Sequence, residues 1–130
     1  LVDVQAQPIA PQGKQWARND NFTATLRFED GSIFTLLYTA MGNKSYPKER
    51  MELFCEGSVY VLDDYKSLQV KGSKAKGWSN MTMEKGQLEE LVALHAAIEH
   101  GKQVVPVEET IAISRATLEI ERLLTDGATC

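Results

Sequence analysis

The sequence predicts an α+β fold, namely an antiparallel open-faced β-sheet with two C-terminal helices packed on one face. Several segments between Leu1 and Val70 alternate apolar and polar residues with a period of two, most clearly residues 21–29, and turn dipeptides or proline bound them. After Gly86 the apolar period changes to about 3.6 residues, which is typical of helices. The chain has 130 residues, so we expect residues 1–130 to form a single domain.

The expected strands are bounded by turn residues or by proline. Asp30-Gly31 and Glu56-Gly57 should each join two neighbouring strands, because these dipeptides favour the positive φ angles of a two-residue type I′ turn. Strands joined in this way form an antiparallel meander. Their expected ranges are 1–9, 21–29, 32–41, 50–55, 58–62 and 65–70.

Two helices are expected, one over residues 87–100 and the other from Glu108 to Asp126. Gly101 is placed to cap the first helix, and the acidic pair Glu108-Glu109 favours the positive end of the second helix dipole. Burial of each large aliphatic side chain in their apolar stripes would contribute about 1.5–3 kcal/mol. Both helices should therefore pack against one face of the sheet.

Residues 32–41 carry large apolar side chains on both faces of the expected strand. If the helices cover one face, the other face stays exposed in a monomer, and exposed apolar faces often mark interfaces. We therefore expect a homo-oligomer that forms through the sheet face, with Phe34, Leu36 and Tyr38 as interface candidates.

Composition excludes several classes of partner and indicates a compartment. The formal net charge of −4 gives no general attraction to nucleic acid or to an anionic membrane, so neither is an expected partner. No apolar run approaches the roughly 20 residues that cross a bilayer. Cys55 and Cys130 form neither a disulfide framework nor a metal-ligand pattern, which fits a cytoplasmic protein. Because the chain opens with Leu1 inside an apolar alternation, we expect a domain cut from a longer polypeptide.

No catalytic, cofactor-binding or metal-binding residues are expected in this chain. A dinucleotide would need a glycine-rich turn between a strand and a helix, and Gly72, Gly77 and Gly86 are better interpreted as flexible loop glycines. A nucleophile and base formed by Cys55 and His95 is a further hypothesis. Their positions favour an inert buried cysteine and a core histidine instead.

The connection between residues 43 and 50 is the most chemically varied segment. It presents amide, ammonium, phenol and guanidinium groups that could hold a small polyol or acid. A solvated connection is the alternative interpretation. The candidates for substrate binding are Asn43, Lys44, Tyr46, Lys48 and Arg50.

Three sequence segments resemble one known family. They are the run from Asn21 to Phe28, the turn Asp30-Gly31-Ser32, and residues 47–50, which read Pro-Lys-Glu-Arg. Together they resemble the C-terminal domain of the glucose–fructose oxidoreductase, inositol dehydrogenase and MocA family. The resemblance continues through residues 89–91 and 106–109. It is nearest to the branch whose front half is similar to zinc-dependent alcohol dehydrogenases.

The resemblance implies an oxidoreductase that acts on a sugar, polyol or related hydroxy compound. Members of the family pair a Rossmann domain, which binds NAD or NADP, with an α+β domain that shapes the substrate site and mediates oligomerisation. The dinucleotide turn and the Glu-Lys-Pro motif have no counterpart here, and Gly86-Gln87 stands where many relatives have Gly-His. The expected partner is therefore an N-terminal Rossmann domain that is absent from this chain, and the isolated domain should be inactive. The alternative is a free-standing protein-interaction module that uses an exposed sheet face.

Overall fold

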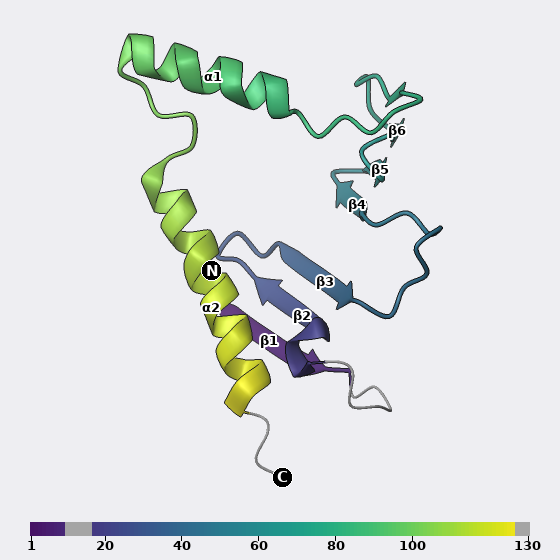
Figure 1. Ribbon diagram of the computed structural model, residues 1–130, viewed down its shortest axis with the longest axis vertical. Helices are drawn as coiled ribbons and strands as arrows, with labels where there is room; N and C mark the ends of the chain where they lie inside the picture. The colour runs from purple at the N-terminus through teal and green to yellow at the C-terminus, as the bar shows by residue number, and fades with distance from the viewer. Residues whose placement is uncertain (10–16, 127–130) are drawn as a thin grey trace. The chain divides into compact units, whose positions relative to one another are not determined.

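The computed structural model describes residues 1–9 and 17–126, apart from the side chain of Arg18. All strand pairs in this part of the chain are antiparallel, and both α-helices follow the strands, which confirms the α+β class. The elements in chain order are β1 (Asp3–Pro8), the 3₁₀ helix η1 (Arg18–Asp20), β2 (Asn21–Arg27), β3 (Ile33–Thr39), β4 (Arg50–Cys55), β5 (Ser58–Asp63), β6 (Ser67–Lys71), β7 (Trp78–Ser79), α1 (Gln87–His100) and α2 (Val107–Asp126) (Figure 1).

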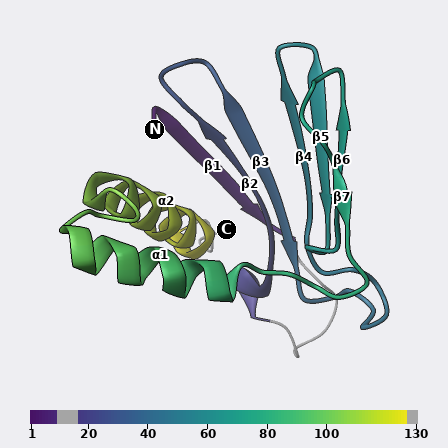
Figure 2. The same ribbon diagram turned by 90° about the horizontal axis from the view of Figure 1, so that it is seen from above.

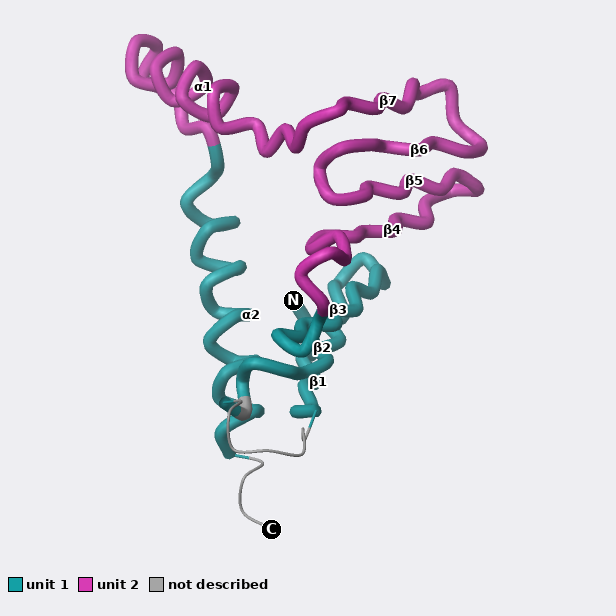
Figure 3. Tube along the Cα trace, turned by 45° about the vertical axis from the view of Figure 1, so that its right-hand side comes forward, with its two compact units in different colours: residues 1–42, 105–130 teal, residues 43–104 magenta. Residues whose placement is uncertain are grey.

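The strands form two sheets, where the sequence predicted one. The first sheet has the order β1-β2-β3, and the second has the order β4-β5-β6-β7. The chain divides accordingly into two compact units, residues 1–42 with 105–130 (unit 1) and residues 43–104 (unit 2) (Figure 3). The two sheets follow one another along the chain, with β3 ending at Thr39 and β4 starting at Arg50.

The core of unit 1 lies between the three-stranded sheet and α2. Ala24 and Leu26 of β2 are buried together with Ala116 of α2, and Ile120 packs beside them. Alternation along β2 places Ala24 and Leu26 on one face, and their small or branched side chains let the helix lie close to the sheet. Figure 1 and Figure 2 show α2 next to β1, with the helix and the strand crossing at an angle. The packing prediction is thus confirmed for α2.

The same face of the sheet carries the three interface candidates. Residues directly opposite each other in an antiparallel pair share a face. Since Leu36 lies opposite Ala24, the residues Phe34, Leu36 and Tyr38 point to the side that carries α2. We had expected them on the reverse side, because periodicity shows which residues share a face and not which face a helix covers. Their role as an interface stays a prediction.

Both faces of β3 nevertheless leave apolar surface exposed. On the α2 side, Phe34 and Tyr38 are 43% and 52% exposed, although the Tyr38 ring stacks on Phe22 at 5.4 Å between centroids. On the reverse side, Ile33 and Leu37 are also exposed. Within unit 1, α2 therefore covers only part of the sheet.

The two predicted hairpin turns differ in type. Both Glu56 and Gly57 have positive φ, 47° and 77°, which confirms a two-residue turn of the predicted kind. In the turn between β2 and β3, Gly31 has a φ of 86° and Asp30 has no positive φ. There the Gly31 amide donates to the Phe28 carbonyl at 3.1 Å, and the Phe28 amide donates to Ser32 at 3.0 Å. This is a three-residue turn with glycine in the left-handed position, and not the predicted type I′ turn.

Helix α1 has the predicted bounds and the predicted cap. Gly101 adopts a φ of 61°, and the Lys102 amide donates to the Ala97 carbonyl at 2.9 Å. No residue of α1 is buried, so packing of a helix on a sheet is shown for α2 and stays a prediction for α1. Neither described α-helix combines the length and the apolarity that crossing a membrane requires.

Candidate functional site

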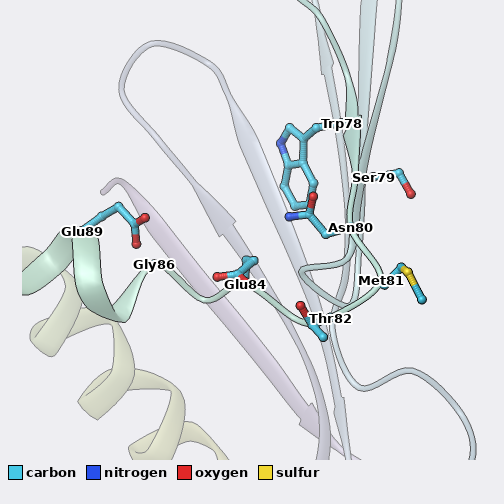
Figure 4. A pocket seen from close by; sticks show the side chains of 8 residues that line it. All are labelled: Trp78, Ser79, Asn80, Met81, Thr82, Glu84, Gly86 and Glu89. Atoms are coloured by element: carbon cyan, nitrogen blue, oxygen red, sulfur yellow. The ribbon is translucent and has the colours of Figure 1, made fainter.

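The best candidate site is an open concavity in unit 2, at the junction between β7 and α1. Its volume is about 890 Å³, and we call it the Trp78 concavity. Figure 4 shows Trp78, Asn80 and Glu84 on one side and Glu89 of α1 on the other. The lining residues are Trp78, Ser79, Asn80, Met81, Thr82, Glu84, Gly86 and Glu89.

Backbone hydrogen bonds hold one wall of the concavity against the four-stranded sheet. Trp78 pairs with Leu68 of β6 in the antiparallel register. Beyond β7, the Asn80 amide donates to the Lys66 carbonyl at 2.7 Å, and the Glu84 amide donates to the Tyr65 carbonyl at 3.0 Å. These bonds fix residues 80–84 beside the turn between β5 and β6, although residues 80–84 contain no regular strand.

The first turn of α1 forms the opposite wall. Gly86 adopts the left-handed conformation, with a φ of 73°, and its carbonyl accepts the Glu90 amide at 2.8 Å. Glycine suits this position because a Cβ atom is disfavoured at positive φ. The helix therefore starts at Gln87 and places Glu89 in its first turn, facing the space beside Trp78 (Figure 4).

The concavity combines one aromatic face with acidic groups. Trp78 is 40% exposed, and the lining includes the carboxylates of Glu84 and Glu89 but no basic side chain. Lys85 lies between lining residues in the sequence, yet its Nζ is 3.2 Å from Glu49 Oε1 and 5.3 Å from the centre of the Tyr65 ring. Such a surface can stack on a ligand and accept hydrogen bonds from it. It contains no pairing of a nucleophile with a base.

A buried carboxylate supports the turn behind this wall. Asp64 is buried, and its Oδ1 accepts the Lys48 amide at 3.2 Å while Oδ2 lies 2.9 Å from Lys66 Nζ. The hydrogen bond from Lys66 is the main cause of the lowered pKa of Asp64, with the Lys48 amide contributing. Asp64 and Tyr65 both have positive φ, 50° and 53°, which is costly for a tyrosine. The hydrogen bonds of Asp64 thus help to hold a strained turn.

We expect Asp64→Asn to lower the urea midpoint of unit 2 at pH 7 and to flatten its acid dependence. The pKa of Asp64 is lower in the folded chain than in the unfolded chain, where an aspartate has a pKa of about 4. The stabilisation that ionised Asp64 contributes is therefore complete above about pH 4, and it is lost as the pH falls through the folded-state pKa. The difference between wild type and variant should therefore shrink below about pH 4.

Urea titrations at several pH values, followed by tryptophan fluorescence in a Trp16→Phe background that leaves Trp78 as the reporter, measure this effect. Asp63→Asn is the control, since Asp63 has no side-chain hydrogen bond among the residues that the structure describes. A difference between wild type and Asp64→Asn that stays constant down to pH 2 would contradict the prediction.

The structure does not bring the predicted substrate-binding residues into the Trp78 concavity. Asn43 Oδ1 accepts the Ser45 amide at 2.9 Å, so this side chain closes its own turn. Arg50 donates through Nη2 to Glu52 Oε1 at 2.7 Å, and this bond raises the pKa of Arg50. Lys44, Tyr46 and Lys48 are exposed side chains on the same connection. Their role in substrate binding stays a prediction.

The sequence interpretation missed the lining residues of the concavity. Trp78 lies in residues 71–85, whose lysine, glycine and serine content predicts a solvated loop with at most an edge strand near residues 80–84, whereas the structure places the short strand β7 at Trp78–Ser79. The available signal was a lone tryptophan followed by polar residues and a glycine at a helix start. That pattern does not show that Glu89, eleven positions later, lines the same concavity.

Two other interpretations change with the structure. Cys55 is exposed at the end of β4 and is not a buried core cysteine. The side chain of His95 is also exposed, and its Nε2 lies 3.5 Å from Glu99 Oε1 on the same helix. Cys55 alternates with apolar residues of β4, and His95 lies on the apolar stripe of α1, so both were expected in the core. In the structure every residue of β4 is exposed and no residue of α1 is buried. Within residues 1–9 and 17–126, no cluster of histidine, cysteine and acidic side chains could hold a metal ion.

The described helix starts do not suit a dinucleotide. A pyrophosphate binds where helix N-terminal amides are free of negative side chains and glycine lets the backbone approach. The first turn of α1 contains Glu89 and Glu90, and the first turn of α2 contains Glu108 and Glu109. These carboxylates would repel a pyrophosphate at either position.

Comparison with protein-family models, with curated proteins and with solved structures finds no match for this chain. The family resemblance therefore depends on the sequence segments quoted above, and it enters the functional argument as a proposal.

Proposed function

We propose that this chain is the substrate-shaping and self-associating domain of an NAD- or NADP-dependent dehydrogenase. The enzyme would act on a sugar, polyol or related hydroxy compound in the cytoplasm. Its Rossmann domain would lie outside this chain, and the domain alone would not be catalytic. The observation that carries the self-associating role is the exposed apolar strand β4.

Every residue of β4 is exposed, on both faces of the strand. Met51, Leu53 and Phe54 are large apolar side chains, and Phe54 is 71% exposed. β4 is also an edge strand of its sheet, so one row of its backbone groups has no partner within that sheet. Exposed apolar edge strands readily pair with another chain, and stable monomers usually cover or charge them. Association of copies through β4 would bury this surface.

We expect Phe54→Lys to weaken self-association by at least about tenfold in the dissociation constant, since the variant places a charge within a buried apolar contact. Sedimentation equilibrium over a range of chain concentrations measures this constant. Tyr46→Lys is the matched control, because Tyr46 is as exposed as Phe54 but lies outside the strands.

Two results would argue against the self-associating role. One is a chain that stays monomeric at about 0.1 mM, where even weak dimers are populated. The other is an equal weakening by both variants, which would place the contact elsewhere.

The dehydrogenase assignment is supported by the three sequence segments that resemble the oxidoreductase family. The complete reading frame tests it. A strand, a glycine-rich turn and a helix preceding Leu1 would support the dehydrogenase. A reading frame without them would favour a free-standing interaction module, which the exposed sheet faces would also serve.

The proposal also predicts how the isolated chain behaves toward cofactor. We expect no saturable heat on titration with NAD or NADP, because both described helix starts are acidic. Calorimetric binding at micromolar affinity would contradict the assignment of the dinucleotide site to a separate domain.

In the full protein, Lys44→Ala should raise KM and leave the association state unchanged if the 43–50 connection contacts substrate.

A further inference from the structure

We propose that the Trp78 concavity binds a small organic cation, with an alkylated ammonium group as the recognised chemistry. This goes beyond the proposed dehydrogenase role and does not depend on it.

The lining carries negative charge that the described residues do not neutralise. Glu84 and Glu89 both line the concavity, and no lysine, arginine or histidine lines it. None of the ion pairs among the described residues involves either carboxylate. A cation placed between them would interact favourably with both, whereas an acidic ligand would be repelled.

Lys85, the basic residue next to Glu84 in the sequence, makes its contacts with residues outside the lining. Lys85 follows Glu84 directly, but its ammonium group is within 3.2 Å of Glu49 Oε1 and lies over the Tyr65 ring. Lys66 is likewise occupied, with its Nζ 2.9 Å from Asp64 Oδ2. These contacts keep both ammonium groups from compensating Glu84 and Glu89.

Trp78 distinguishes an organic cation from a metal ion. Alkylated ammonium groups are attracted to the face of an indole and are weakly hydrated, so aromatic and acidic groups together recognise them. Hard metal ions prefer a cluster of several oxygen ligands, and the described residues contain no group of three or more histidine, cysteine or acidic side chains placed to hold one. Figure 4 shows Trp78 and Asn80 at the strand side of the concavity, Glu89 at the helix side, and Glu84 between them. The aromatic group and the two carboxylates thus line one concavity.

Two-dimensional amide spectra of the 130-residue chain test the proposal, with tetramethylammonium chloride as the probe. Sodium chloride replaces the probe at each step, so that the ionic strength stays constant and general screening cancels. We expect saturable shifts of the Trp78 indole N–H and of the amides of Asn80, Glu84 and Glu89. The indole signal is assigned by its loss in Trp78→Phe.

Matched variants locate the site. Glu84→Gln and Glu89→Gln should each weaken binding about two- to fivefold, the range for a single exposed charge contact. Trp78→Ala should weaken it by a similar factor through loss of the cation–π contact, and Trp78→Phe should restore part of it. Glu90→Gln removes the same charge from the same helix turn at a residue outside the lining, and it should leave binding unchanged.

The remaining outcomes overturn the proposal. Shifts that do not saturate, or that sodium chloride alone reproduces, would show that the concavity does not select this cation. Equal saturable shifts with uncharged myo-inositol would identify a hydroxyl-binding surface instead. An effect of Glu90→Gln as large as that of Glu89→Gln would show attraction to the whole acidic helix start. Backbone amide spectra of each variant report directly whether it is folded.

Discussion

Leu124→Ala is expected to lower the free energy of unfolding of unit 1 by about 2–5 kcal/mol. Leu124 is 2% exposed, and α2 buries few residues besides it among those that the structure describes. Truncation removes apolar contact and leaves a cavity that the rigid helix and sheet cannot fill completely. Because unit 1 has a small core, this loss is a large fraction of its stability.

Hydrogen exchange of the Ala24 and Leu26 amides in β2 measures the effect, since these amides lie in the central strand of unit 1. Leu118→Ala is the matched control. Leu118 lies on the same helix and is 69% exposed, so its truncation should change stability by less than about 0.5 kcal/mol. Equal effects of the two substitutions would mean that α2 does not pack with Leu124 inward.

Gly72→Ala is expected to destabilise unit 2 by about 2–5 kcal/mol, from two separate causes. Gly72 has a φ of 73°, in the left-handed region that alanine avoids. An added Cβ would also lie 2.3 Å from the carbonyl oxygen of Gly57, and backbone atoms cannot move aside as a flexible side chain can. The strand ends at β5 and β6 would have to separate.

Two other glycines separate these causes. Gly57→Ala carries the left-handed strain alone, because its φ is 77° and no atom lies within 4 Å of the new Cβ. Gly42→Ala carries neither strain nor contact. Urea unfolding followed by tryptophan fluorescence, again in the Trp16→Phe background, should rank the losses as Gly72→Ala, then Gly57→Ala, then Gly42→Ala. A Gly72→Ala variant no less stable than Gly57→Ala would show that the close approach is absent.

Gly72 also shows how a sequence pattern can mislead. Its neighbours are lysine and serine, so we interpreted it, with Gly77, as a flexible loop glycine. Both are instead positions of close backbone approach, since a Cβ on Gly77 would lie 2.3 Å from the Leu68 carbonyl oxygen. The partner atoms belong to other strands, and no local pattern identifies them.

Elements that depend on near neighbours were predictable. The range 87–100 of α1 and its Gly101 cap follow from helical spacing and from the conformational freedom of glycine. The turn at Glu56-Gly57 follows in the same way. The turn at Asp30 differs because Asp30 Oδ1 accepts both the amide and the hydroxyl of Ser32, at 2.9 Å and 2.7 Å. These bonds also lower the pKa of Asp30.

The candidate site was less predictable than the fold. The sequence predicted substrate binding by residues 43–50, because varied polar groups occur close together there along the chain. The structure shows that several of these groups bond within their own segment, as Asn43 does with Ser45 and Arg50 does with Glu52. The lining of the Trp78 concavity combines a strand, a loop and a helix start, whose proximity depends on hydrogen bonds to Lys66 and Tyr65.

The sequence by itself determined the α+β class, the order of strands and helices, and most of their boundaries, because period, turn residues and helix caps act over a few residues. Only the tertiary structure decided that the strands form two sheets, that α2 covers the face bearing Leu36, and that Glu89 lies across from Trp78. These features depend on which distant surfaces pack together. Alternation specifies which side chains share a face of a sheet, but it does not predict which element covers that face.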